Sequence, residues 1–145
     1  MKCSFGTIVR LILGLMFLVA GVMKITDPVG FFSDLLSYRV AFPEIFLRMV
    51  AVGLPWLEVI TGLGLILNFW PETIRPIVAV PCLIFVLMLG QAVIRGIDLN
   101  CGCFGSGGRN WFERPDVALV RAGFLLAASL YLAVAPSTPP VDTVP

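Results

Sequence analysis

The stretch Thr7–Met23, TIVRLILGLMFLVAGVM, carries one charged side chain, Arg10, in an otherwise apolar run. Its length approaches the ~20 residues that an α-helix needs to cross the hydrocarbon core of a bilayer. Basic residues near its start also suit a cleaved signal peptide, but no small-residue cleavage site follows, and the run leads directly into Lys24. We therefore expect this stretch to be retained as a membrane-spanning helix.

Three further apolar stretches have a similar length, Arg48–Phe69, Ile77–Ile94 and Val117–Ala135. Together with the first stretch they predict an all-α protein, an integral membrane four-helix bundle with both termini on one side. Pro76 and Pro115 stand just before two of these stretches, where proline suits the first helical turn. Gly123 and Ala127 place two small side chains one turn apart and suggest a face for close helix packing.

The composition agrees with a membrane protein and excludes several other classes. The chain is 59% hydrophobic and 13% charged, with a mean hydropathy of +0.99, whereas soluble domains carry about 25% charged residues. A net charge of +1 without a long basic run argues against a nucleic-acid partner. Histidine is absent, which excludes imidazole as a general base or metal ligand. We expect one membrane domain over residues 1–135 and a disordered Pro/Thr-rich tail over residues 136–145.

The segment Val29–Phe46 is amphipathic rather than uniformly apolar. Bulky apolar residues alternate with polar ones at helical spacing, Phe31, Phe32, Leu35 and Leu36 against Ser33, Asp34, Ser37 and Arg39. The segment is too short and too charged to cross a bilayer, so it predicts an interfacial helix between the first two spans.

Two of the four cysteines lie one residue apart in Asn100–Gly105, NCGCFG, a polar loop between the last two spans. A disulfide between Cys101 and Cys103 would close a small, strained ring, and strained disulfides are the reactive ones. We interpret the two cysteines as a redox-active, catalytic pair. Two other interpretations stay open: small loop residues that happen to be cysteine, or half of a metal site completed by a partner. Cys82 lies inside a predicted span, and we interpret it as a small buried hydrophobic residue.

Glu58 lies near the middle of the second predicted span, where an acid costs about 2.5–3.5 kcal/mol on insertion scales. We therefore expect Glu58 to lie inside the bundle, paired with Lys24 or Arg121, whose long side chains enter from the same side of the membrane. The three residues form either a structural ion pair or a site for handling protons or quinone.

The charge distribution and the redox chemistry give opposite orientations. Lys2, Arg10 and Arg75 lie on the side of the termini, and the other basic residues lie on or near the side of the Cys-Gly-Cys loop. The positive-inside rule then predicts a cytoplasmic loop. Disulfide chemistry instead favours the outside, because the cytosol keeps thiols reduced.

Three motifs carry a resemblance to a known family: Gly21–Pro28, GVMKITDP; Leu54–Glu58, LPWLE; and Cys101–Gly105, CGCFG. In this order and spacing the chain resembles the MauE branch of the DoxX-like membrane proteins, from about Arg10 to Ala135. The Cys-Gly-Cys-Phe-Gly motif is the specific part. The resemblance implies a four-helix membrane protein. It also implies a link to maturation of the disulfide-rich small subunit of methylamine dehydrogenase, beside a thioredoxin-like partner, and to quinone-linked membrane redox complexes.

Residues and resemblance together predict a multi-pass protein of the bacterial inner membrane that assists disulfide formation in exported proteins with a thioredoxin-like periplasmic protein. In this hypothesis Cys101 and Cys103 exchange disulfides, and electrons pass to or from quinone near Glu58, Arg121 and Lys24. The alternatives are a non-catalytic scaffold subunit of a larger membrane redox complex and a protein that handles metal through its thiolates. The client protein and the direction of electron flow stay open.

Overall fold

The computed structural model describes residues 5–97 and 114–134. These residues form five helices, α1 (Phe5–Thr26), α2 (Pro28–Ser37), α3 (Glu44–Leu67), α4 (Pro71–Ile94) and α5 (Pro115–Val134). Four of them, all but α2, are long and apolar enough to cross a membrane, with mean hydropathies of 1.9 to 2.6. The all-α fold with four candidate spans and a short helix between the first two is confirmed, and the protein is a multi-pass membrane protein.

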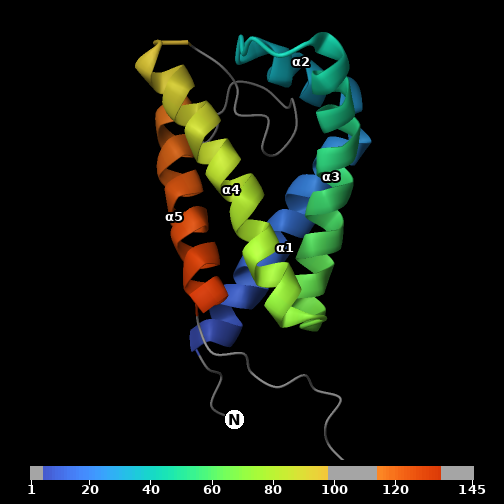
Figure 1. The fold of residues 1–145 in the computed structure, drawn as a ribbon, viewed down its shortest axis with the longest axis vertical. Helices are drawn as coiled ribbons and strands as arrows, with labels where there is room; N and C mark the ends of the chain where they lie inside the picture. The colour runs from blue at the N-terminus through green and yellow to red at the C-terminus, as the bar shows by residue number, and fades with distance from the viewer. Residues whose placement is uncertain (1–4, 98–113, 135–145) are drawn as a thin grey trace, which may run out of the picture.

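The long helices run alternately up and down, so α1 begins and α5 ends at the same end of the bundle (Figure 1). At that end the rings of Phe5 and Tyr131 meet edge to face, with their centroids 5.9 Å apart. The short helix α2 lies across the opposite end, where α3 and α5 begin and α4 ends (Figure 1). We call these two ends the terminal end and the α2 end.

The spans begin earlier than the apolar pattern predicts, because polar residues and prolines form their first turns. Pro43 is the N-cap of α3, and α4 begins at Pro71 after a turn in which Asn68 and Trp70 adopt left-handed conformations. Pro71 therefore takes the first-turn position that was predicted for Pro76, which lies inside α4. Pro115 does begin α5, as predicted.

Helix α2 is shorter than the predicted interfacial segment Val29–Phe46. The carboxylate of Asp27 caps its N-terminus by accepting a hydrogen bond of 2.9 Å from the backbone N–H of Gly30. The helix ends at Ser37, because Arg39 has a positive φ of 47° and such a backbone angle cannot continue a right-handed helix. Residues 44–46 belong to the first turn of α3.

The bundle consists of two closely packed helix pairs, α1 with α3 and α4 with α5, with fewer contacts between the pairs. Glycines allow α1 and α3 to approach: a Cβ on Gly62 would lie 2.7 Å from the backbone nitrogen of Leu18 and 2.8 Å from the carbonyl oxygen of Gly14. The prediction that Gly123 marks a close-packing face is wrong for the described part of the chain, in which no atom lies within 4 Å of a Cβ placed there.

Candidate functional site

A buried ion pair joins the two helices of the first pair. The ammonium of Lys24 on α1 donates hydrogen bonds of 2.6 and 2.7 Å to the two carboxylate oxygens of Glu58 on α3. Lys24 is 2% exposed and Glu58 is 7% exposed. The geometric expectation that Glu58 lies inside the bundle against one of two cations is therefore met, and the cation is Lys24. Each charge compensates the other where neither has access to water.

The crossing of α1 and α3 explains why Lys24 meets Glu58. A Cβ on Gly21 would lie 2.8 Å from the carbonyl oxygen of Pro55, so only glycine allows the two backbones to approach so closely at this point. Because α1 and α3 run in opposite directions (Figure 1), Lys24 and Glu58, each three residues further along its helix, lie about one turn to either side of the crossing. Their side chains extend toward each other across it and meet in the ion pair. The glycine therefore brings one buried charge within hydrogen-bonding distance of the other.

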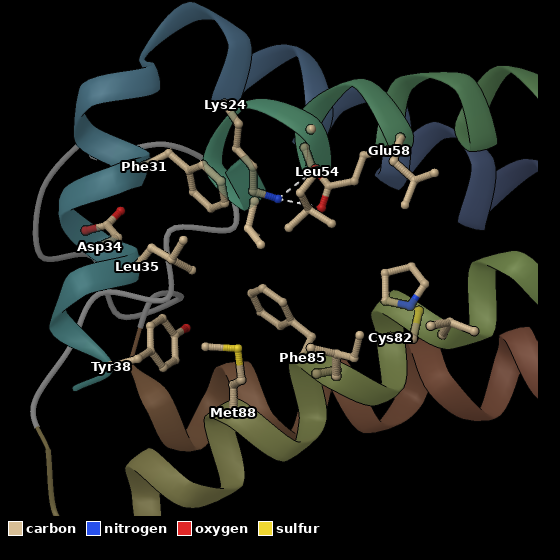
Figure 2. A pocket seen from close by; sticks show the side chains of 18 of the residues that line it. Lys24, Phe31, Asp34, Leu35, Tyr38, Leu54, Glu58, Cys82, Phe85 and Met88 are labelled. Carbon is tan, nitrogen blue, oxygen red and sulfur yellow. Dashed lines mark hydrogen bonds and ion pairs between the residues drawn. The ribbon is translucent and has the colours of Figure 1, made fainter. Parts of the chain in front are cut away.

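A cavity of about 720 Å³ opens beside this pair, between the two helix pairs and beneath α2. Figure 2 shows Phe31 and Leu35 of α2, and Tyr38 directly after its last residue, facing Phe85 and Met88 of α4 across it. Its size lies within the range of small-molecule sites, and an apolar lining with few polar groups is typical of them. The cavity is the strongest candidate for a ligand site among the described residues.

Two aromatic rings flank the ammonium group at the cavity wall. The Nζ atom of Lys24 lies 5.2 Å from the centroid of Phe31 and 5.9 Å from that of Phe85. Such rings attract a cation through their negative faces. Two hydrogen bonds of the ammonium go to Glu58, and an ammonium has three donors. Among the described residues, no acceptor of the third N–H of Lys24 is found.

The polar groups of α2 complete the wall of the cavity. Asp34 and Tyr38 lie one turn apart and both line it. Burial raises the pKa of Tyr38 well above its ordinary value, and the negative charge of Asp34 raises it further. The phenol therefore stays protonated at neutral pH and keeps its O–H as a hydrogen-bond donor.

Arg121 and Cys82 line the same cavity from α5 and α4. Cys82 is 5% exposed and packs in an apolar cluster with Leu13 and Val78, which agrees with its interpretation as a small buried hydrophobe. The structure thus brings Lys24, Glu58 and Arg121 to one cavity, as expected for a shared site. Their binding of a cofactor stays a prediction.

Comparison with known proteins gives the family. The family model described as "Methylamine utilisation protein MauE" matches residues 2–135 of the chain. The chain belongs to the MauE family. The methylamine utilization protein MauE of Paracoccus denitrificans is 30% identical over 131 residues, covering 90% of this chain and 68% of that protein. The protein of the same name from Methylorubrum extorquens is 31% identical over 142 residues, covering 94% of this chain and 74% of that protein. No solved structure matches.

The cysteine pair that the sequence singled out in this MauE-family chain, Cys101 and Cys103, lies outside the described residues. The helices on either side, α4 and α5, end and begin at the α2 end (Figure 1). Within residues 5–97 and 114–134, no group of three or more Cys, Asp and Glu side chains is arranged to hold a metal ion.

Sequence reasoning missed the α2 residues that line the cavity of this MauE-family protein. The amphipathic pattern assigns Phe31 and Leu35 to the apolar face of the predicted interfacial helix and Asp34 to its polar face. It does not single out Tyr38. The spacing of these four residues, three and four apart, was the available signal, because it puts all four on one side of a helix. The amphipathic pattern alone did not show that this side covers a cavity rather than lipid.

Proposed function

We propose that this protein is a thiol–disulfide redox protein of the bacterial inner membrane that assists disulfide formation in exported proteins, with a thioredoxin-like periplasmic partner. The observation that carries the proposal is the Cys-Gly-Cys motif in a chain of the MauE family. The relatives' name links them to methylamine utilisation. We propose methylamine dehydrogenase maturation, or that of a related disulfide-rich protein, as the process served.

In the proposed reaction the disulfide between Cys101 and Cys103 is attacked by a thiolate of the partner or client. A mixed disulfide forms, and the second thiol of that protein then releases it as a disulfide. The two cysteines are left reduced, having taken up two electrons and two protons. Since a three-residue ring is strained, its disulfide should be a comparatively strong oxidant.

The cavity beside the ion pair suits a quinone as the acceptor that restores this disulfide. A quinone has an apolar ring and carbonyl oxygens that accept hydrogen bonds, and the cavity offers aromatic walls and the ammonium of Lys24. A quinone bound there would oxidise the dithiol by accepting two electrons and two protons from it. In this proposal Lys24 orients the ring, and Glu58 keeps the ammonium in place.

Thiol trapping in intact cells tests the proposal directly. Alkylation of the wild type should show Cys101 and Cys103 as a mixture of dithiol and disulfide that shifts when client synthesis is induced. Cys101→Ser and Cys103→Ser should each abolish client oxidation while the protein still inserts into the membrane, and one of them should trap a mixed disulfide. Cys3→Ser serves as the matched control and should retain activity.

If the Cys101→Ser/Cys103→Ser protein supports full client maturation, the redox proposal is wrong. A scaffold subunit of a larger redox complex would then fit, since it needs the membrane bundle without the thiols. Loss of client maturation together with stoichiometric zinc or copper on the purified wild type would instead favour metal handling.

A further inference from the structure

Two arginines lie at the terminal end of the bundle, opposite the cavity. Arg10 lies five residues beyond Phe5, where the described part of α1 begins, and Arg75 lies four residues beyond Pro71 at the start of α4. At 1.5 Å per residue, both Cα atoms are roughly 6–8 Å inside their helices. The aromatic pair Phe5–Tyr131 lies at the same end. Both arginines are therefore within reach of the headgroup region of one leaflet.

The surroundings of these two arginines favour the binding of an anion. Arg75 is 6% exposed, and its Nη1 lies 3.5 Å from the carbonyl oxygen of Leu132 in the last turn of α5. Arg10 lies close enough to Arg75 for the two positive charges to repel. The Nε and Nη1 atoms of Arg10 are buried and have no hydrogen-bond partner among the described residues. A buried donor without an acceptor is costly, and an anion would supply one.

An apolar groove of about 700 Å³ follows the seam between α1 and α5 from Val9, the neighbour of Arg10 in the sequence. It is lined on α1 by Val9, Ile12, Leu13 and Met16, and on α5 by Val117, Val120, Arg121, Phe124, Leu125 and Ala128. Ile12 and Phe124 are 56% and 73% exposed, so the groove opens toward the surface that faces lipid. It runs from Val9 near the terminal end past the middle of the bundle to Val117, two residues after the start of α5 at the α2 end.

We propose that the arginines and the groove together form a binding site for an anionic phospholipid. Its phosphate lies against Arg10 and Arg75, and one acyl chain occupies the groove between α1 and α5. Basic pockets between membrane helices bind anionic head groups in this way, because guanidinium groups donate charge-assisted hydrogen bonds to phosphate oxygens. The two cationic charges favour phosphatidylglycerol over a zwitterionic lipid. The groove shares Met16, Arg121 and Leu125 with the wall of the cavity beside the ion pair, whereas Arg10 and Arg75 do not line that cavity.

Titration of the delipidated full-length protein with lipid tests the site, with native mass spectrometry as the measure of occupancy. We expect phosphatidylglycerol to bind and to raise the thermal midpoint, and phosphatidylethanolamine to bind at least several-fold more weakly. Arg10→Gln should weaken phosphatidylglycerol binding about tenfold, because a hydrogen bond to a charged group is lost. Arg10→Lys keeps the charge and should retain most of the affinity.

Matched variants separate this site from a general attraction of lipid. Arg48→Gln removes an exposed charge that is paired with Glu44 at the α2 end and should bind phosphatidylglycerol like the wild type. Ala128→Phe fills the groove and should weaken phosphatidylglycerol binding with both arginines intact. Equal binding of the two lipids, or wild-type affinity in Arg10→Gln, would overturn the proposal. So would inorganic phosphate that stabilises the protein as much as phosphatidylglycerol does.

Discussion

At the scale of single residues, the ion pair between Lys24 and Glu58 connects stability to the candidate site. The two charges are buried where α1 crosses α3 and are two of the polar groups in a mostly apolar cavity wall. Removing one partner of such a pair is far more costly than removing both, because it leaves an uncompensated charge in a medium of low dielectric constant. The pair is therefore expected to behave as a unit in mutagenesis.

Glu58→Gln should lower the free energy of unfolding in detergent by about 3–5 kcal/mol, because the ammonium of Lys24 loses its counter-charge. The measurement is thermal or denaturant unfolding of the purified protein. Glu44→Gln is the matched control: its pair with Arg48 has side chains that are 61% and 66% exposed, and its change should stay within about 1 kcal/mol. The double variant Lys24→Met/Glu58→Met should recover most of the loss. If Glu58→Gln is as mild as Glu44→Gln, the pair does not hold the helices together.

The sequence predicted that Glu58 needs a cation, since an acid in a span is expensive, but it left two candidates, Lys24 and Arg121. The choice depends on where α1 crosses α3, and that crossing is set by a contact between Gly21 and Pro55. Neither residue is charged, and they are far apart in the sequence. Hydropathy and charge patterns alone do not encode such a contact.

At the scale of helices, the close packing of α1 against α3 depends on backbone contacts at glycines. In a membrane the hydrophobic effect does not drive helices together, so small residues at the contact gain van der Waals packing for the backbones. Gly14 and Gly62 face each other across α1 and α3, and a Cβ on either would lie 3.0 Å or less from a backbone oxygen of the other helix.

Gly62→Ala should destabilise the bundle by about 1–3 kcal/mol, because the new methyl group forces α1 and α3 apart. Gly53→Ala on the same helix is the control, since no atom lies within 4 Å of a Cβ there. That change should be neutral or stabilise the helix by up to about 1 kcal/mol, because alanine has the higher helix propensity. A lower thermal midpoint for Gly62→Ala with an equal or higher one for Gly53→Ala would support the close contact of α1 and α3. A Gly62→Ala protein that unfolds like Gly53→Ala would contradict it.

Helix number and type could be predicted from the sequence, because four long apolar runs leave few alternatives in a bilayer. The ends of the helices could not be predicted, since apolar runs mark the part of a helix in the hydrocarbon core, whereas the helix continues into the membrane interface. For this reason α4 begins at Pro71, six residues before the predicted apolar stretch Ile77–Ile94. The small-residue pair Gly123 and Ala127 was singled out for packing, because spacing shows which residues share a face but not which face meets a neighbour.

At the scale of the molecule, two helix pairs enclose a cavity at one end, and the described part of the chain begins at Phe5 and ends at Val134 at the other. The cavity, α2, the end of α4 and the start of α5 all lie at the α2 end (Figure 1). The Cys-Gly-Cys motif is connected to this end through both helices, because it falls between Ile94 and Pro115 in the sequence. The proposed dithiol chemistry and the proposed ligand site therefore belong to the same side of the membrane.

This arrangement predicts which positions share a side of the membrane. In a variant without native cysteines, single cysteines at Phe69 and Val134 mark the terminal end, and those at Arg39 and Arg95 mark the α2 end; all four residues are exposed. A membrane-impermeant maleimide added to spheroplasts should label one set and spare the other until the membrane is opened.

Labelling at the α2 end would place the disulfide chemistry outside, where thiols are not kept reduced. Labelling at the terminal end would follow the positive-inside rule and exclude a periplasmic partner for the motif. Labelling that mixes the two sets would contradict the four-span fold itself, because an even number of crossings cannot separate Phe69 from Val134.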